Sequence, residues 1–137
     1  MLVPKKVKHR KWQKGRSKTR MVETRGTTLA FGSFGLKATT AAWINSRQIE
    51  AARRTISNFM KREGKVWIRI FPDKPITKSS GATLGGGKGA VDYYVFPVRP
   101  GRMLFEIDGI TPAIAKEALR LASHKLPVRT RMITKAK

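Results

Sequence analysis

Apolar residues recur at helical spacing in two parts of the chain. The first helix is predicted over about residues 47–63, because steps of three and four residues place its apolar side chains on one face. These side chains are Ile49, Ala52, Ile56, Phe59 and Met60. Asn45 and Gln48 have the spacing of a capping box at its start, and Gly64 is well placed to end it.

The second predicted helix begins at Pro112, with Thr111 as its cap. Proline suits the first position of a helix because its missing N–H would have no partner there. The apolar stripe consists of Ile114, Ala118, Leu121 and Ala122. Pro127 marks the end of this region.

Other segments have the alternation or β-branched content of strands. Residues 28–44 favour two short strands or one bent strand, with Gly32 and Gly35 at a bulge or turn. Pro100-Gly101 forms a turn, so the segments on either side of it should pair as a hairpin. Beyond residues 28–44, the predicted strands are residues 65–71, 91–98, 102–107 and 128–133.

The order of these elements predicts an α+β fold with two helices and a mixed or antiparallel sheet. The chain of 137 residues is the size of one domain, and its apolar share of 40% is enough for one modest core. The expected core contains Ile49, Ile56, Phe59, Ile68, Ile70, Phe105 and Leu121.

The net charge is the most informative property of the composition. Lys and Arg number 30 against 8 Asp and Glu, so the formal net charge is +22. Such an excess favours a polyanionic partner, because the compact chain repels itself. No cysteine is present, which excludes disulfides and thiolate metal sites. No apolar run approaches the roughly 18 residues of a membrane span, and no membrane partner is expected.

The charge is densest at the start. Residues 1–27 are predicted to form an extended basic arm that orders on a partner, and residues 28–137 a globular domain. Within the arm the acid Glu23 stands among ten cations: Lys5, Lys6, Lys8, Arg10, Lys11, Lys14, Arg16, Lys18, Arg20 and Arg25. On the first helix, Arg47, Arg54 and Lys61 recur every seven residues and predict a cationic face opposite the core.

Residues 73–90 are predicted to form a long, glycine-rich basic loop. A phosphate-binding P-loop is not indicated, since Ala82 and Gly89 stand where the motif needs glycine and a hydroxyl. Among the tryptophans, Trp43 and Trp67 are interpreted as core residues, whereas Trp12 is expected to contact the partner.

The sequence gives little support for catalysis or metal binding. The two histidines, His9 and His124, lie in different segments, so no metal site, no catalytic residue and no cofactor is predicted. Glu106 and Asp108 share a strand face and leave a metal-dependent nuclease open, although acids in so basic a chain are better interpreted as salt-bridge partners. A nucleoid-type DNA binder explains the charge equally well, and a membrane-active cation less well.

Particular strings are more specific than the composition. Residues 65–75 read KVWIRIFPDKP, and residues 47–53 read RQIEAAR. Shorter matches are Pro4-Lys5-Lys6, Phe31-Gly32, Gly87-Lys88-Gly89, Pro100-Gly101-Arg102, Phe105-Glu106 and Lys125-Leu126-Pro127. Together they resemble, in order and over nearly the whole chain, the bacterial and organellar ribosomal large-subunit protein number sixteen of the universal uL family.

The resemblance implies an α+β fold with a hammerhead-like β element and a structural role in the large ribosomal subunit. The implied partners are 23S rRNA, 5S rRNA, A-site and P-site tRNA and neighbouring ribosomal proteins, and family members join late in assembly. The arm lysines and arginines inherit rRNA contact. Lys74, Lys78, Thr83, Gly87, Lys88 and Gly89 inherit a place near tRNA. The expected location is the cytoplasmic ribosome of a bacterium, with an organellar source left open.

One departure concerns the loop tip. Family members usually carry an arginine-methionine pair just before the Gly-Lys-Gly sequence, whereas this chain has Thr83-Leu84. The tip has therefore lost a cation, and the tRNA contact of that arginine is not inherited. The remaining expectation is an approach through backbone amides and Lys88.

Overall fold

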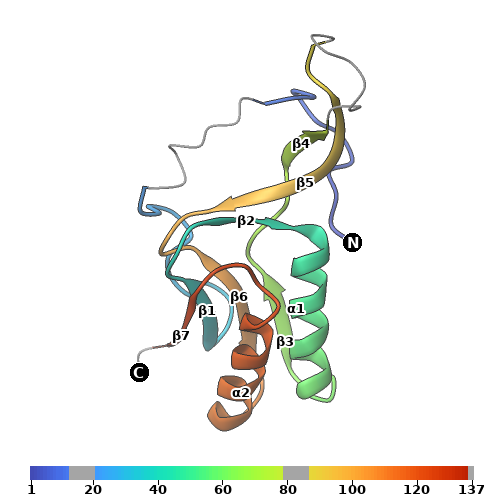
Figure 1. Cartoon of the computed structure of the whole chain (residues 1–137). Helices are drawn as coiled ribbons and strands as arrows, with labels where there is room; N and C mark the ends of the chain where they lie inside the picture. The colour runs from blue at the N-terminus through green and yellow to red at the C-terminus, as the bar shows by residue number, and fades with distance from the viewer. Residues whose placement is uncertain (13–20, 79–86, 136–137) are drawn as a thin grey trace.

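The computed structural model describes residues 1–12, 21–78 and 87–135 (Figure 1). The described chain folds into two helices and seven strands. In chain order they are β1 (Phe34–Ala38), β2 (Ala42–Asn45), α1 (Ser46–Phe59), β3 (Lys65–Ile68), β4 (Lys74–Lys78), β5 (Ala90–Val98), β6 (Met103–Asp108), α2 (Pro112–Ser123) and β7 (Thr130–Thr134).

The strands form two antiparallel sheets, which confirms the α+β class. One sheet has the order β3-β6-β1-β7 and the other β2-β5-β4. The predicted hairpin between residues 91–98 and 102–107 is wrong, because the turn at Pro100-Gly101 carries the chain from one sheet into the other. β5 already bonds β2 and β4 on its two edges, and β6 bonds β1 and β3.

The core lies between the two helices and the four-stranded sheet (Figure 1). Ile49, Ile56, Ile70 and Phe105 are buried as predicted. Phe59 is 39% exposed, so its assignment to the core is wrong; Met60, the residue that caps the helix, is buried instead. Ile68 and Leu121 are half-buried. On α2 the buried residues are Ala115, Ala118, Leu119 and Ala122, so the predicted stripe is rotated, and Ile114 is exposed.

The helix starts follow their local signals. Asn45 accepts a hydrogen bond from the Gln48 N–H, and Gln48 accepts one from the Asn45 N–H, so the capping box is confirmed. Thr111 caps α2 with Pro112 in its first turn, also as predicted. The end of α1 differs, since the helix stops at Phe59 rather than near Gly64. Lys61 and Arg62 adopt left-handed φ angles of 54° and 63°, which turn the chain out of the helix.

The segment expected as a long loop is partly regular structure. Residues 74–78 form β4, which pairs with β5 in register Pro75↔Tyr94 and Ile76↔Tyr93. Figure 1 shows β4 and the adjoining half of β5 reaching away from the helices, with the N-terminal segment beside them. Residues 79–86, which include Thr83, lie outside the described residues.

Candidate nucleic-acid interface

A buried carboxylate organises the segment that precedes β1. The side chain of Glu106 is fully buried, and its Oε1 accepts hydrogen bonds from the N–H groups of Ala30, Phe31 and Gly32, each at 2.9 Å. Arg69 forms an ion pair with Oε2. Burial opposes ionisation, but the hydrogen bonds from the backbone and from Arg69 outweigh it and lower the pKa of Glu106. Glu106 therefore fixes the backbone of residues 30–32 against β6.

Asp108, two residues further along β6, also accepts hydrogen bonds. Its Oδ1 receives one from the Ser33 hydroxyl at 2.9 Å and one from the Gly109 N–H at 2.8 Å. The salt-bridge interpretation of the two acids is thus confirmed for Glu106, whereas Asp108 binds neutral donors. Among the described residues, no group of three or more His, Cys, Asp or Glu is placed to hold a metal ion.

The predicted cationic face of α1 is interrupted. Arg54 is 72% exposed and forms an ion pair with Glu50, which also binds Arg53. The hydrogen bond from Arg53 is the largest cause that lowers the pKa of Glu50 to about 2. Arg47 is exposed at the start of the helix. Lys61 is exposed as well, but it lies beyond the helix end, so it does not continue the row of Arg47 and Arg54.

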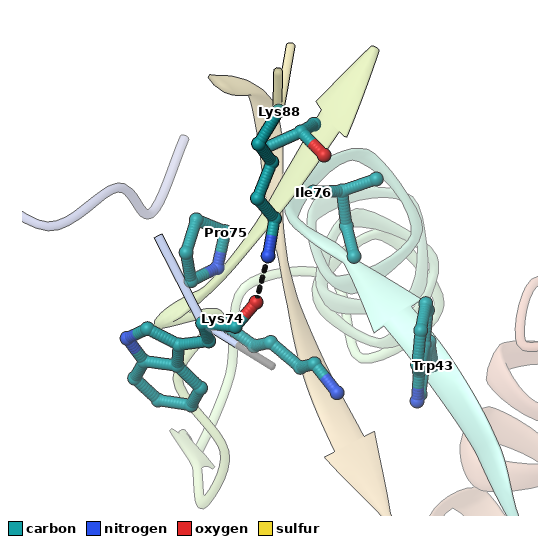
Figure 2. Close-up of a pocket in the computed structure, with 7 residues that line it drawn as sticks. Trp43, Lys74, Pro75, Ile76 and Lys88 are labelled. Carbon is teal, nitrogen blue, oxygen red and sulfur yellow. Dashed lines mark hydrogen bonds between the residues drawn. The ribbon is translucent and has the colours of Figure 1, made fainter. Parts of the chain in front are cut away.

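Two lysines connect the N-terminal segment, residues 1–12, to the β4–β5 hairpin by hydrogen bonds. The Lys11 Nζ donates a hydrogen bond to the backbone carbonyl of Lys88 at 3.0 Å, although the two residues are 77 positions apart. In return, the Lys88 Nζ donates to the backbone carbonyl of Trp12, the bond drawn in Figure 2. We call this pair of contacts the lysine clasp. It places the end of the described arm segment against the start of β5.

A cavity of about 320 Å³ lies beside the lysine clasp (Figure 2). Its lining comes from the arm, β2 and the β4–β5 hairpin: Trp12, Trp43, Lys74, Pro75, Ile76, Thr77 and Lys88. The Lys74 ammonium lies 4.3 Å from the centre of the Trp43 ring. Lys74 is buried. The assignment of Trp43 to the core is therefore wrong: the side chain is a half-buried wall of this cavity and a partner of a cation.

The later part of the predicted arm is bonded to the turn between β5 and β6. The Glu23 N–H donates to the Pro100 carbonyl at 2.9 Å, and the Met103 N–H donates to the Gly26 carbonyl at 2.8 Å. Arg102 donates to the carbonyl of Arg25 at 3.3 Å. Burial lowers the pKa of Arg102. These contacts attach residues 23–26 to the turn between the two sheets.

The structure places the predicted site residues in three ways. Exposed cations of the arm and hairpin are Lys5, Lys6, Lys8, Arg10, Arg25, Lys78 and Lys88. Gly87 is also exposed, Lys11 and Gly89 are half-buried, and Lys74 is buried. Outside the described residues are Lys14, Arg16, Lys18, Arg20 and Thr83.

Sequence reasoning missed two parts of this region. The Glu106–Arg69 pair left one signal, a glutamate inside the apolar strand MLFEID, but nothing in the sequence named its partners. The lysine clasp left no signal, because it joins two backbone carbonyls to lysines of distant segments.

The fold and charge define a basic α+β scaffold in which Glu50, Glu106 and Asp108 serve as hydrogen-bond acceptors or ion-pair partners. A model of the family described as ribosomal protein L16p/L10e matches residues 4–133, nearly the whole chain. The chain belongs to this family, which confirms the resemblance. It is accordingly a structural constituent of the large ribosomal subunit, from a family of structural proteins rather than enzymes. Within the described part of the chain, no helix is long and apolar enough to cross a membrane.

Proposed function

We propose that the chain binds 23S rRNA through its basic arm and the exposed cations of α1. The observation that carries this proposal is the distribution of charge among the described residues. Lys5, Lys6, Lys8 and Arg10 are all exposed in one short segment that has no helix or strand. The described acids, in contrast, bind groups of the chain itself at Glu50, Glu106 and Asp108. The four exposed cations of this segment remain available for phosphates.

The mechanism is electrostatic and needs no covalent step. Lysine and arginine side chains neutralise phosphates and release condensed counterions, which makes affinity depend on salt. If the arm and α1 contact about ten phosphates, the slope of log affinity against log salt is roughly −7 to −9. Neutralised rRNA segments no longer repel each other, so the arm stabilises their close packing late in subunit assembly, beside neighbouring proteins and 5S rRNA.

The proposal extends to tRNA at the hairpin. Lys78, Gly87 and Lys88 are exposed at the end of the β4–β5 hairpin that reaches away from the helices (Figure 1). A cation and bare glycine amides suit contact with a phosphate backbone. We place this end of the hairpin beside the A-site and P-site tRNA. With Thr83-Leu84 in place of the family's arginine-methionine pair, Lys78 and Lys88 are the exposed cations at this end of the hairpin, and the Lys88 ammonium keeps two N–H donors beyond its bond to Trp12.

The test is incorporation of charge-reversed chains into large subunits, followed by sedimentation in high salt. Replacement of Lys5, Lys6 and Lys8 by Glu should abolish incorporation and weaken binding to 23S rRNA. Replacement of Arg47, Arg54 and Lys61 by Glu should do the same. The matched control changes three exposed lysines elsewhere, namely Lys116, Lys125 and Lys135, and should incorporate.

Equal behaviour of the arm variant and its control would overturn the assignment of the arm. Binding to duplex DNA as tight as binding to 23S rRNA, at the same salt, would favour the nucleoid-type alternative instead.

A further inference from the structure

A second cavity opens at the far end of the four-stranded sheet, away from the lysine clasp. Its volume is about 490 Å³, and it lies where β3 begins and β6 ends. Lys65 and Asp108 face each other there as cross-strand neighbours of β3 and β6. The residues that line it are Phe31, Gly64, Lys65, Trp67, Asp108 and Gly109.

One wall of the cavity is aromatic. The Phe31 and Trp67 rings are stacked, with centroids 6.0 Å apart and planes inclined by 18°. Phe31 is 58% exposed, so its ring is accessible to a ligand. Its backbone N–H is bonded to the buried Glu106, so the ring is held at the surface by a rigid partner. Exposed, pre-positioned aromatic rings are the surfaces on which unpaired bases stack.

Two glycines complete the lining, at a point where the backbones of residues 64 and 108–109 approach closely. Gly64 and Gly109 both have left-handed φ angles, 73° and 81°. A Cβ on Gly64 would lie 2.3 Å from the Asp108 carbonyl, and a Cβ on Gly109 would lie 3.0 Å from the Gly64 Cα. Neither position therefore admits a side chain without movement of the backbone.

The polar lining is one carboxylate and one ammonium. Both hydrogen bonds to Asp108 use Oδ1, from Ser33 and Gly109. Oδ2 has no hydrogen-bond partner among the described residues. A free carboxylate oxygen repels phosphate but accepts from N–H groups, so at an RNA-binding surface it suits the edge of a base. Lys65 is exposed beside it and can neutralise the phosphate of the same nucleotide.

We propose that this cavity binds one unpaired RNA base that carries an amino group, stacked on the Phe31–Trp67 wall and bonded to the Oδ2 of Asp108. The inference rests on the proposed rRNA binding and adds a nucleotide-selective subsite to it. A carboxylate accepts readily from an exocyclic amino group such as cytosine N4. Uracil offers its N3–H only between two carbonyl oxygens, which the carboxylate repels. The cavity therefore discriminates against uracil.

The test compares the affinities of the full chain for short cytidine and uridine oligonucleotides at neutral pH and constant salt. Both are pyrimidines, so size and backbone charge are matched. The expected preference for cytidine is roughly tenfold, the effect of one well-placed hydrogen bond to a charged group. Fluorescence anisotropy of labelled oligonucleotides measures both affinities.

Asp108→Asn is the decisive variant. Its Oδ1 still accepts from Ser33 and Gly109, while an amide donor replaces the carboxylate oxygen, so the cytidine preference should vanish or reverse toward uridine. The matched control is Asp73→Asn, which removes the same charge from an exposed position and should leave the ratio unchanged. Phe31→Leu provides a second variant at an exposed side chain, and it should also reduce the ratio toward one.

Failure of this subsite is distinguishable from failure of rRNA binding. Tight binding to 23S rRNA together with a cytidine-to-uridine ratio of one overturns the subsite alone. An unchanged preference in Asp108→Asn does the same. Loss of binding to all RNA overturns the proposed function as well.

Discussion

Arg69, directly after β3, forms an ion pair with Glu106 of β6, and the same guanidinium donates to the Thr28 carbonyl at 3.1 Å. The pair therefore connects two strands of one sheet to the segment in front of β1. Glu106 is fully buried, and the Arg69 side chain is mostly so. A buried carboxylate is stable only when hydrogen-bond donors or cations satisfy its oxygens. Here Arg69 binds one oxygen of Glu106, and three backbone N–H groups donate to the other.

Glu106→Gln is expected to lower the free energy of unfolding by about 2–4 kcal/mol, because it removes the buried charge that Arg69 and three N–H groups require. Urea denaturation of both chains measures the difference. Glu117→Gln is the control, since the Glu117–Arg120 pair lies at the surface, where solvent screens it, and its loss should leave the free energy of unfolding nearly unchanged. Equal losses in the two variants would contradict the role of Glu106.

The ionised Glu106 side chain should make the free energy of unfolding depend on pH. Its pKa is lowered in the folded chain, so its contribution is complete above the ordinary glutamate value of about 4.3 and is lost as the pH falls through the folded value. The free energy of unfolding should therefore fall more steeply below about pH 5 in the unaltered chain than in Glu106→Gln. Parallel curves from thermal melts would contradict this expectation.

The lysine clasp should restrict the arm. Lys88→Met removes the donor to the Trp12 carbonyl while it keeps a long apolar side chain. We expect the amides around Trp12 to exchange with solvent several-fold faster, as loss of about 1 kcal/mol of hydrogen bonding allows. Hydrogen exchange followed by mass spectrometry detects this change. Lys78→Met is the control, because it removes an exposed charge of the same hairpin; equal exchange in both variants would contradict the clasp.

Several local features were predictable because their causes lie within a few residues. The Asn45–Gln48 capping box and the Thr111-Pro112 start of α2 depend on neighbouring backbone groups alone. The end of α1 was less predictable, because Gly64 is a good stop signal but Lys61 and Arg62 turn the chain earlier. Met60 is buried because it follows the buried Ile56 by four residues and so lies on the same face of the helix, whereas Phe59 lies at the edge of that face.

The candidate sites were predictable in charge and unpredictable in geometry. The arm lysines indicate a polyanionic partner from the sequence alone, because their charge does not depend on tertiary contacts. Trp43 looked like a core residue because its sequence neighbours are apolar, yet its ring meets Lys74 from another strand. Asp108 was visible as an acid on a strand, but the cavity beside it needs Gly64 and Phe31 from two other segments.

By itself, the sequence determined the helix starts, the α+β class, the excess of positive charge and, through its longest strings, the family. Only the tertiary structure decided that β5 and β6 lie in different sheets, and that Glu106 anchors residues 30–32. The physical reason is that strand pairing and buried polar networks join residues far apart in the chain, so their partners are chosen by competition in three dimensions rather than by local pattern.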